Sequence, residues 1–152
     1  MDGYSWFENP DSNGAVWWRI DLPQPKAELV EQSSYPVLNR GDVAEIYVKF
    51  KNTSWATWKS SGQNAVRLAV DKNWAQRTAW QGPGWISENR ITAAQEGDVA
   101  PWTTGTFRFK IKVPSDMPSG KHRFYTRLVE ENYSWFENPD SNGAVWWEIT
   151  VR

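Results

Sequence analysis

Paired acidic side chains are the simplest route to a hydrolase, and two close pairs stand out in this sequence. Glu130 and Glu131 are adjacent in a stretch with strand-like alternation, so their carboxylates are expected to point to opposite faces. Glu96 and Asp98 flank a glycine in an expected loop, and no pattern directs either toward another acid. The chain has no cysteine, a single histidine, His122, and neither a Ser-His-Asp nor a phosphate-loop pattern. We therefore expect no catalytic residue and no enzymatic activity.

Two copies of the string Asp-Ser-Asn-Gly, at 11–14 and 140–143, resemble the opening of a calcium-binding loop. Such a loop needs a bidentate Glu at its twelfth position, where these copies have Leu22 and Val151. Asn-Gly also supplies the positive φ angles that a tight hairpin turn requires. We therefore expect turns at both places, with no metal site and no cofactor.

Tryptophan is the most unusual feature of the composition, with 12 in 152 residues. Indole rings pack protein cores, and the same rings can stack on a flat ligand such as a sugar. Core packing is the main interpretation here. The residues expected in the core are Trp58, Trp147, Phe50, Phe109 and Leu128. In the loop-rich middle of the chain, strand alternation does not dictate burial, and the candidates there for stacking on a ligand are Trp74, Trp80 and Trp102.

Basic residues concentrate in two consecutive expected strands, although the formal net charge of the chain is −1. In an immunoglobulin-type sandwich, two such strands belong to opposite sheets, so their outer faces point away from each other. We therefore expect no nucleic-acid partner, while a weak contact with an anionic glycan on one face stays open. The chain also has no apolar run of about 20 residues, so we expect no membrane insertion. The basic residues are Arg108, Lys110, Lys112, Lys121, Arg123 and Arg127.

The elements that must position these side chains are strands, because apolar residues recur with a period of two. In 104–113, for example, Phe107, Phe109, Ile111 and Val113 share one face. No segment shows a helical period. The fold class is therefore all-β, an immunoglobulin-like antiparallel β-sandwich of about seven or eight strands without a disulfide. Strands are expected near 27–35, 43–52, 64–71, 89–94, 104–113, 121–131 and 143–152, with a weak one within 74–80.

A segment of the chain occurs twice: Tyr4–Ile20 returns at Tyr133–Ile149, with 16 of 17 positions identical and an offset of 133 − 4 = 129 residues. Such a period fits a tandem array of sandwich-sized modules, and an engineered copy is the alternative. We divide the chain into residues 1–22, a duplicated terminal hairpin that is either the tail of a preceding repeat or an engineered copy; residues 23–25, a proline-containing linker; and residues 26–152, the sandwich domain.

Both copies offer the same final strand, so the apolar pattern cannot choose between them. Charge favours the C-terminal copy, because Glu148 would face Arg123 and Arg127 where the N-terminal copy has Arg19. We expect residues 144–152 to fill the position of the final strand. Residues 4–20 are expected to form a separate hairpin, packed on the domain or on a neighbouring molecule by its own aromatic residues.

Several strings of the domain, taken in order, carry a family resemblance. They are KNTSWATW at 51–58, VRLAV at 66–70, GWISENR at 84–90, FRFKIKVPSDMPSGKHRFYTRLV at 107–129 and WWEITV at 146–151. Together they resemble the immunoglobulin-like, four-tryptophan domain of the Next-to-BRCA autophagy receptors. The similarity is closer to bacterial relatives of that domain, which are accessory modules of surface and cell-wall-associated proteins.

The resemblance implies a non-catalytic sandwich whose tryptophans mostly build the core. Asn52, Trp58 and Trp147 match family positions, and Trp85 lies in a matching string, which implies that it is packed. Tyr125 stands where receptor-type members often carry tryptophan, so autophagy cargo recognition is not carried over.

The sequence thus predicts a non-catalytic structural or spacer module of a tandem-repeat bacterial surface or secreted protein. Such a module would be extracellular or at the cell surface, with neighbouring copies of itself as partners. Two alternatives stay open: a carbohydrate-binding module that uses loop tryptophans on a cell-wall or other polysaccharide, and a protein-interaction module.

Overall fold

The structure is a computed structural model that describes residues 16, 18, 24–72, 78–137 and 143–152. Among these residues, no helix is long and apolar enough to cross a membrane. The elements are β1 (Ala27–Gln32), β2 (Val37–Leu38), β3 (Val43–Asn52), β4 (Val66–Val70), the 3₁₀ helix η2 (Thr78–Trp80), β5 (Arg90–Ala93), β6 (Thr104–Lys112), β7 (Gly120–Glu130), β8 (Ser134–Trp135) and β9 (Ala144–Val151).

Two sheets form an immunoglobulin-like sandwich, which confirms the predicted fold class. One sheet has the order β1-β3-β6, and the other has the order β2-β9-β7-β4-β5, with β8 added on β7. All strand pairs are antiparallel except β2 with β9. The weak strand expected within 74–80 is wrong in its described part, because residues 78–80 form the helix η2. The short strands β2 and β8 were not predicted.

Aromatic rings fill the core between the sheets. Phe124 of β7 lies at the centre, with Trp147 stacked at 6.3 Å between ring centroids and Trp85 stacked at 6.1 Å. Phe109 meets Trp147 edge-on at 5.7 Å. Each such ring pair adds about 0.5–1.5 kcal/mol beyond the area that it buries. The apolar alternation of β6 and β9 therefore places large rings from both sheets against one another.

The final strand of the fold is the C-terminal copy, as the charge pattern predicted. β9 pairs with β7 in a register that sets Glu148 opposite Arg123, and the Glu148 carboxylate lies 2.9 Å from the Lys121 ammonium. In the N-terminal copy, Val16 and Trp18 are exposed. The remainder of that copy, and with it the predicted hairpin of residues 4–20, lies outside the described residues.

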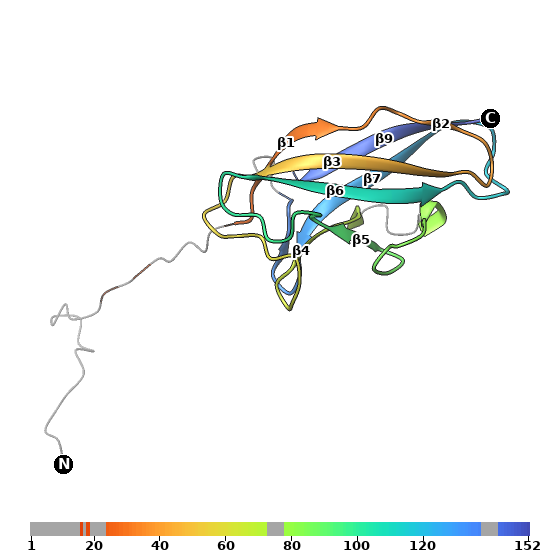
Figure 1. Cartoon of the computed structure of the whole chain (residues 1–152). Helices are drawn as coiled ribbons and strands as arrows, with labels where there is room; N and C mark the ends of the chain where they lie inside the picture. The colour runs from red at the N-terminus through yellow and green to blue at the C-terminus, as the bar shows by residue number, and fades with distance from the viewer. Residues whose placement is uncertain (1–15, 17, 19–23, 73–77, 138–142) are drawn as a thin grey trace, which may run out of the picture.

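The chain enters and leaves the sandwich at opposite ends. β1 begins at one end, and β9 runs in the same general direction and finishes at the other end, beside β2 (Figure 1). Two contacts show this shared direction, because residues 32 and 36 meet residues 146 and 150 in the same order. The Gln32 side chain donates to the Trp146 carbonyl at 3.0 Å, and the Thr150 N–H donates to the Pro36 carbonyl at 3.0 Å. Residue 27 and residue 152 are therefore separated by the length of the domain.

Candidate functional site

Two loops meet at the end of the sandwich where β3 finishes and β6 begins. Residues 53–58 follow β3 and residues 99–103 precede β6, and the backbones of Trp58 and Val99 hold them together through two hydrogen bonds of 2.9 Å. The buried side chain of Asn52 fixes both loops, since its Nδ2 donates to the carbonyls of Ala56 (2.8 Å) and Val99 (3.0 Å). The two loops are therefore one rigid unit.

Trp102 has an unusual backbone within this unit. Its φ angle is +66°, in the left-handed region that a bulky side chain rarely adopts. A hydrogen bond from its N–H to the Asn52 carbonyl, at 2.6 Å, holds that conformation. Strained backbone of this kind gathers at sites with a function, because the surrounding structure must compensate for its cost of about 1–3 kcal/mol. The Trp102 indole is 53% exposed.

Trp102 forms an exposed aromatic pair with Trp55, which is 80% exposed. The ring centroids are 6.0 Å apart and the ring planes cross at 87°, so the two indoles form a right-angled corner. The Lys51 ammonium lies 5.8 Å from the centre of the Trp102 ring. Large apolar rings left in water beside a cation suit a ligand with both apolar faces and hydroxyl groups, of which a sugar is the simplest example.

A groove of about 290 Å³ lies in the same region of the fold. Trp58 lines it and is 3% exposed, and its indole N–H finds no hydrogen-bond acceptor among the described residues. A buried donor without a partner costs free energy. Burial raises the pKa of Glu130, which also lines the groove. The lining residues are Gln24, Pro25, Ser54, Ala56, Thr57, Trp58, Asn64, Glu130 and Tyr133.

A second group of aromatic side chains lies on the outer face of β7 and β9. Trp146 has Tyr35 at 5.5 Å and Tyr125 at 6.4 Å, measured between ring centroids. The Arg123 guanidinium lies 4.5 Å from the centre of the Trp146 ring, in cation–π contact. Trp146 is only partly exposed, whereas Trp55 and Trp102 are both exposed, so the corner of Trp55 and Trp102 is the better candidate for a ligand.

The structure separates the three candidate stacking residues. Trp102 is exposed, as a platform requires, and Trp74 lies outside the described residues. Trp80 is wrong as a candidate: it ends η2 and is 2% exposed, packed against Phe124 with 6.5 Å between ring centroids. The 3₁₀ turn carries the ring into the core, so its faces are not open to a ligand.

The residues expected in the core all lie there. Their exposed fractions are 3% for Trp58, 0% for Trp147, 0% for Phe50, 6% for Phe109 and 0% for Leu128. Trp85 is partly buried and packs against the core, and its indole N–H donates to the Lys110 carbonyl at 2.7 Å.

Sequence reasoning missed Trp55. The available signal was its place in the turn after β3, only three residues before the buried Trp58, where strand alternation has ended. Its partner Trp102 is 47 positions away in the sequence, so only the fold brings the two rings together.

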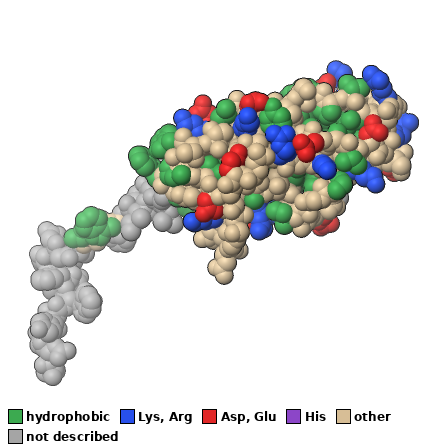
Figure 2. All heavy atoms as spheres, in the orientation of Figure 1, with side chains coloured by type: hydrophobic (Ala, Val, Ile, Leu, Met, Phe, Trp, Pro, Cys, Tyr) green, Lys and Arg blue, Asp and Glu red, His purple; other side chains and the backbone are tan. Residues whose placement is uncertain are grey.

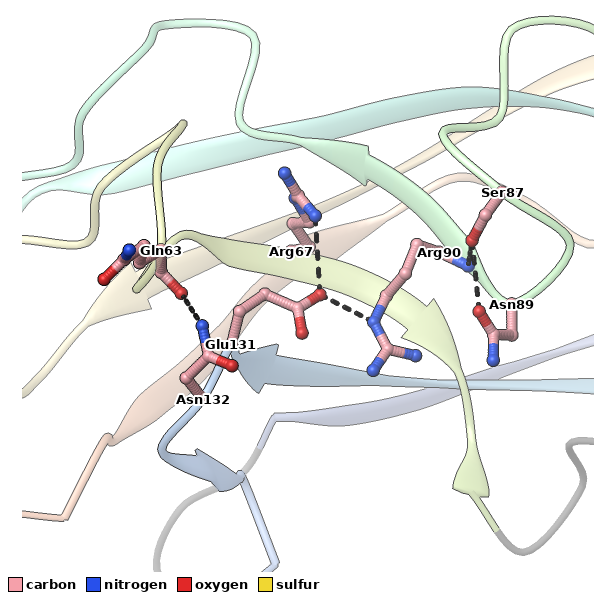
Figure 3. Close-up of polar contacts among 7 residues, drawn as sticks. All are labelled: Gln63, Arg67, Ser87, Asn89, Arg90, Glu131 and Asn132. Carbon is pink, nitrogen blue, oxygen red and sulfur yellow. Dashed lines mark hydrogen bonds and ion pairs between the residues drawn. The ribbon is translucent and has the colours of Figure 1, made fainter.

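The acidic residues considered for catalysis have separate surroundings and are not paired with one another. Glu131 accepts from Arg90 at 2.6 Å and lies 3.6 Å from Arg67 (Figure 3). Glu130 lines the groove described above. Asp98 accepts from Lys59 and from the Ser60 N–H, and these hydrogen bonds lower its pKa.

Glu96 faces Thr106 of β6. Burial raises the pKa of its carboxyl, but hydrogen bonds from Thr106 outweigh that effect, and the net shift is downward. Among the described residues, no three His, Cys, Asp or Glu side chains gather in a way that could hold a metal ion.

The basic residues divide between the sheets, as the topology predicts. Arg108, Lys110 and Lys112 belong to β6, whereas Lys121, Arg123 and Arg127 belong to β7 in the opposite sheet. Acidic and basic side chains are interspersed on the face shown in Figure 2. Arg127 is half-buried and is paired with Asp71 at 3.0 Å.

Comparisons with known proteins give weak similarities. No protein-family profile matches the sequence, and no curated protein matches it. The solution structure of a CARDB domain from Pyrococcus furiosus has a TM-score of 0.48 and 18% identity, over 87% of this chain and 97% of that domain. A crystal structure of that domain in complex with di-metal ions has a TM-score of 0.47 and 16% identity, over 88% of this chain and 97% of that one.

A larger protein also contains a similar region. The β-glucosidase from Listeria innocua in complex with glucose has a TM-score of 0.39 and 16% identity, over 84% of this chain and 16% of the enzyme. All of these similarities concern the fold alone.

Proposed function

We propose that the chain is a non-catalytic structural module, a rigid spacer in a tandem-repeat bacterial surface or secreted protein. The observation that carries the proposal is the path of the chain, which enters at the start of β1 and leaves at the end of β9, at opposite ends of the sandwich (Figure 1). Modules joined through such ends extend in line instead of folding back on one another.

Two features of the sequence support this role. The duplicated segment recurs after 133 − 4 = 129 residues, which leaves room for one sandwich per period. The linker after the first copy contains Pro23 and Pro25, and prolines make a short linker stiff. The resemblance to the bacterial relatives of the four-tryptophan domain points the same way, to an extracellular or cell-surface location with neighbouring modules as partners.

Small-angle X-ray scattering tests the spacer role. Chains with one, two and three copies of the unit 21–149, each chain ending in residues 150–152 so that its last β9 is complete, should lengthen by about 40 Å per added unit, since a ten-residue strand such as β3 is about 34 Å long and loops extend it. The matched control replaces Pro23 and Pro25 by glycine and should shorten the mean increment. Compact particles whose maximum dimension does not grow with each unit would contradict the proposal.

A second candidate function is carbohydrate binding at the corner of Trp55 and Trp102. The specific observation in its favour is the pair of exposed indoles, Trp55 and Trp102, with Trp102 held at a strained φ of +66°. A sugar ring of a polysaccharide chain would stack on an exposed indole, and the groove of about 290 Å³ lies in the same region of the fold.

Titration of tryptophan fluorescence with cell-wall and plant polysaccharides tests this candidate. The apparent affinity obtained from saturable quenching should fall at least tenfold in Trp55→Ala or in Trp102→Ala. The matched control is Trp18→Ala, since Trp18 is also exposed, at 83%, but belongs to the N-terminal segment. Flat titrations across the panel, or equal loss in the control, would reject the site.

A further inference from the structure

The β9 position is the place in the fold where the N-terminal copy of the duplicated segment could bind. β9 lies between β7 and β2 and places four apolar side chains in the core, all at most 5% exposed: Val145, Trp147, Ile149 and Val151. Subtracting the 129-residue offset from these four numbers gives Val16, Trp18, Ile20 and Leu22. A β9 position that accepts one copy therefore accepts the apolar face of the other.

Within one chain, the N-terminal copy cannot reach this position in the same register. Residue 26 is anchored beside β3, where its carbonyl accepts from the Thr53 N–H at 3.1 Å. From there the chain advances six residues to Gln32, which contacts Trp146, and β9 continues five residues further to Val151.

Leu22 in the place of Val151 would thus lie about 35 Å along the strand direction from residue 26. The four peptide units between residues 22 and 26 span at most about 14 Å.

We infer that residues 15–22 of one chain exchange with β9 of a second copy of this chain and then pair between its β7 and β2. The end of β9 lies at the exit end of the sandwich, so the donor's own domain would follow directly beyond that end (Figure 1). The contact is head-to-tail, so it generates open chains of molecules, or rings where the rotation between successive copies closes. This inference does not depend on the spacer role, because it concerns the pairing of one strand.

Differences between the copies set which one is preferred. Arg19 replaces Glu148, so it would face Arg123 and lose the contact with Lys121. Pro23 replaces Arg152, whose N–H donates to the Leu38 carbonyl at 2.9 Å, and proline has no N–H to replace that bond.

β9 therefore pairs with β7 and β2 more favourably than residues 15–22 of another chain would, and β9 is also covalently joined to its own domain. The fraction of molecules in which residues 15–22 of another chain replace β9 should increase with protein concentration. It should increase further when a substitution weakens the packing of β9.

A cysteine pair tests the exchange, because the natural chain has no cysteine. Lys121 pairs with Thr150 of β9, and Asp21 is the residue equivalent to Thr150 in the N-terminal copy. Directly paired residues in antiparallel strands have Cα atoms about 4.5–5.5 Å apart, within the range that a disulfide bridges. The variant Asp21→Cys/Lys121→Cys should therefore form disulfide-linked dimers and longer chains on oxidation. The substitutions remove the charge pair that Asp21 and Lys121 would form in the exchanged state, and they also remove the ion pair between Lys121 and Glu148 of β9.

The matched control, Asp21→Cys/Lys110→Cys, places the second cysteine at an exposed position of β6 in the other sheet. At equal concentration we expect at least ten times less covalent dimer from this control. Equal yields in the two variants would overturn the inference. A disulfide-linked monomer of Asp21→Cys/Lys121→Cys would overturn it as well, because it would place the N-terminal copy in its own domain.

A second measurement uses no cysteine. Trp147→Ala weakens the resident strand, so analytical ultracentrifugation should show more self-association than in the parent chain. Adding Trp18→Ala should abolish that increase, because the donor strand then lacks the same ring. Self-association that persists unchanged in Trp18→Ala/Trp147→Ala would overturn the inference.

Discussion

Replacing Asn52 tests whether one buried amide organises the end of the sandwich that carries the exposed tryptophans. Asn52 is fully buried, and its Oδ1 accepts from the Ser54 N–H at 3.0 Å and from the Ser54 hydroxyl at 2.5 Å. Its Nδ2 donates to two carbonyls, those of Ala56 and Val99. Both the donor and the acceptor capacity of the amide are therefore used inside the protein.

Asn52→Ala removes these four hydrogen bonds and leaves the buried Ser54 N–H without its acceptor. A hydrogen bond contributes about 0.5–1.5 kcal/mol net, and an orphaned buried group costs about 1–3 kcal/mol. Since the two carbonyls keep other donors, the Trp58 N–H for Val99 and the Ser54 hydroxyl for Ala56, we expect a total loss of about 2–4 kcal/mol.

Asn52→Asp preserves the shape of the side chain but places a carboxylate oxygen against two carbonyl oxygens. Burial without a cation raises the pKa of the introduced carboxyl above its value in the unfolded chain. The charged form is therefore destabilising above the unfolded pKa, and the loss of stability should shrink as pH falls. At neutral pH we expect a larger loss than for Asn52→Ala.

Urea denaturation followed by tryptophan fluorescence measures these changes, with the exposed Asn64→Ala as control. The control should stay within about 0.5 kcal/mol of the parent. If Asn52→Ala shifted the unfolding free energy no more than this control, the assignment of Asn52 as the organising residue would be refuted.

Four further predictions concern other parts of the fold. Burial raises the pKa of Glu130, so Glu130→Gln should raise the melting temperature at pH 7 and leave it unchanged near about pH 3, where both side chains are neutral; equal shifts at both pH values would argue against this. Gly82→Ala would set a Cβ 2.1 Å from the Lys110 carbonyl oxygen and should cost at least about 1–3 kcal/mol in urea denaturation; a loss within about 0.5 kcal/mol of the parent would contradict this. Asp71→Ala should cost about 3 kcal/mol in the same assay, because it leaves the half-buried Arg127 guanidinium without its carboxylate, 3.0 Å away; a loss below 1 kcal/mol would show that water screens the pair. Excess calcium or a chelator should leave the melting temperature unchanged, and a shift of several degrees would reveal a metal site.

Local sequence was sufficient for the sheets and for much of the core. The alternation in 43–52 and 104–113 predicted β3 and β6, because a strand sends successive side chains to opposite faces and only one face meets the other sheet. The same rule placed Trp147 and Phe109 inward. The difference between Glu148 and Arg19, together with the short connection from β7 to the C-terminal copy, predicted which copy pairs with β7, because opposite charges across strands attract and a short loop costs less entropy to close.

Only the tertiary structure decided which loop tryptophans are open to a ligand. In loops there is no period to read, so burial depends on what the rest of the chain places nearby. Trp80 is carried into the core by a 3₁₀ turn that no sequence pattern predicted. Trp55 and Trp102 become neighbours because the register of β3 with β6 brings the ends of these strands together, and because Asn52 ties the two loops to each other. Such contacts join residues far apart in sequence, so the alternation of single strands contains no information about them.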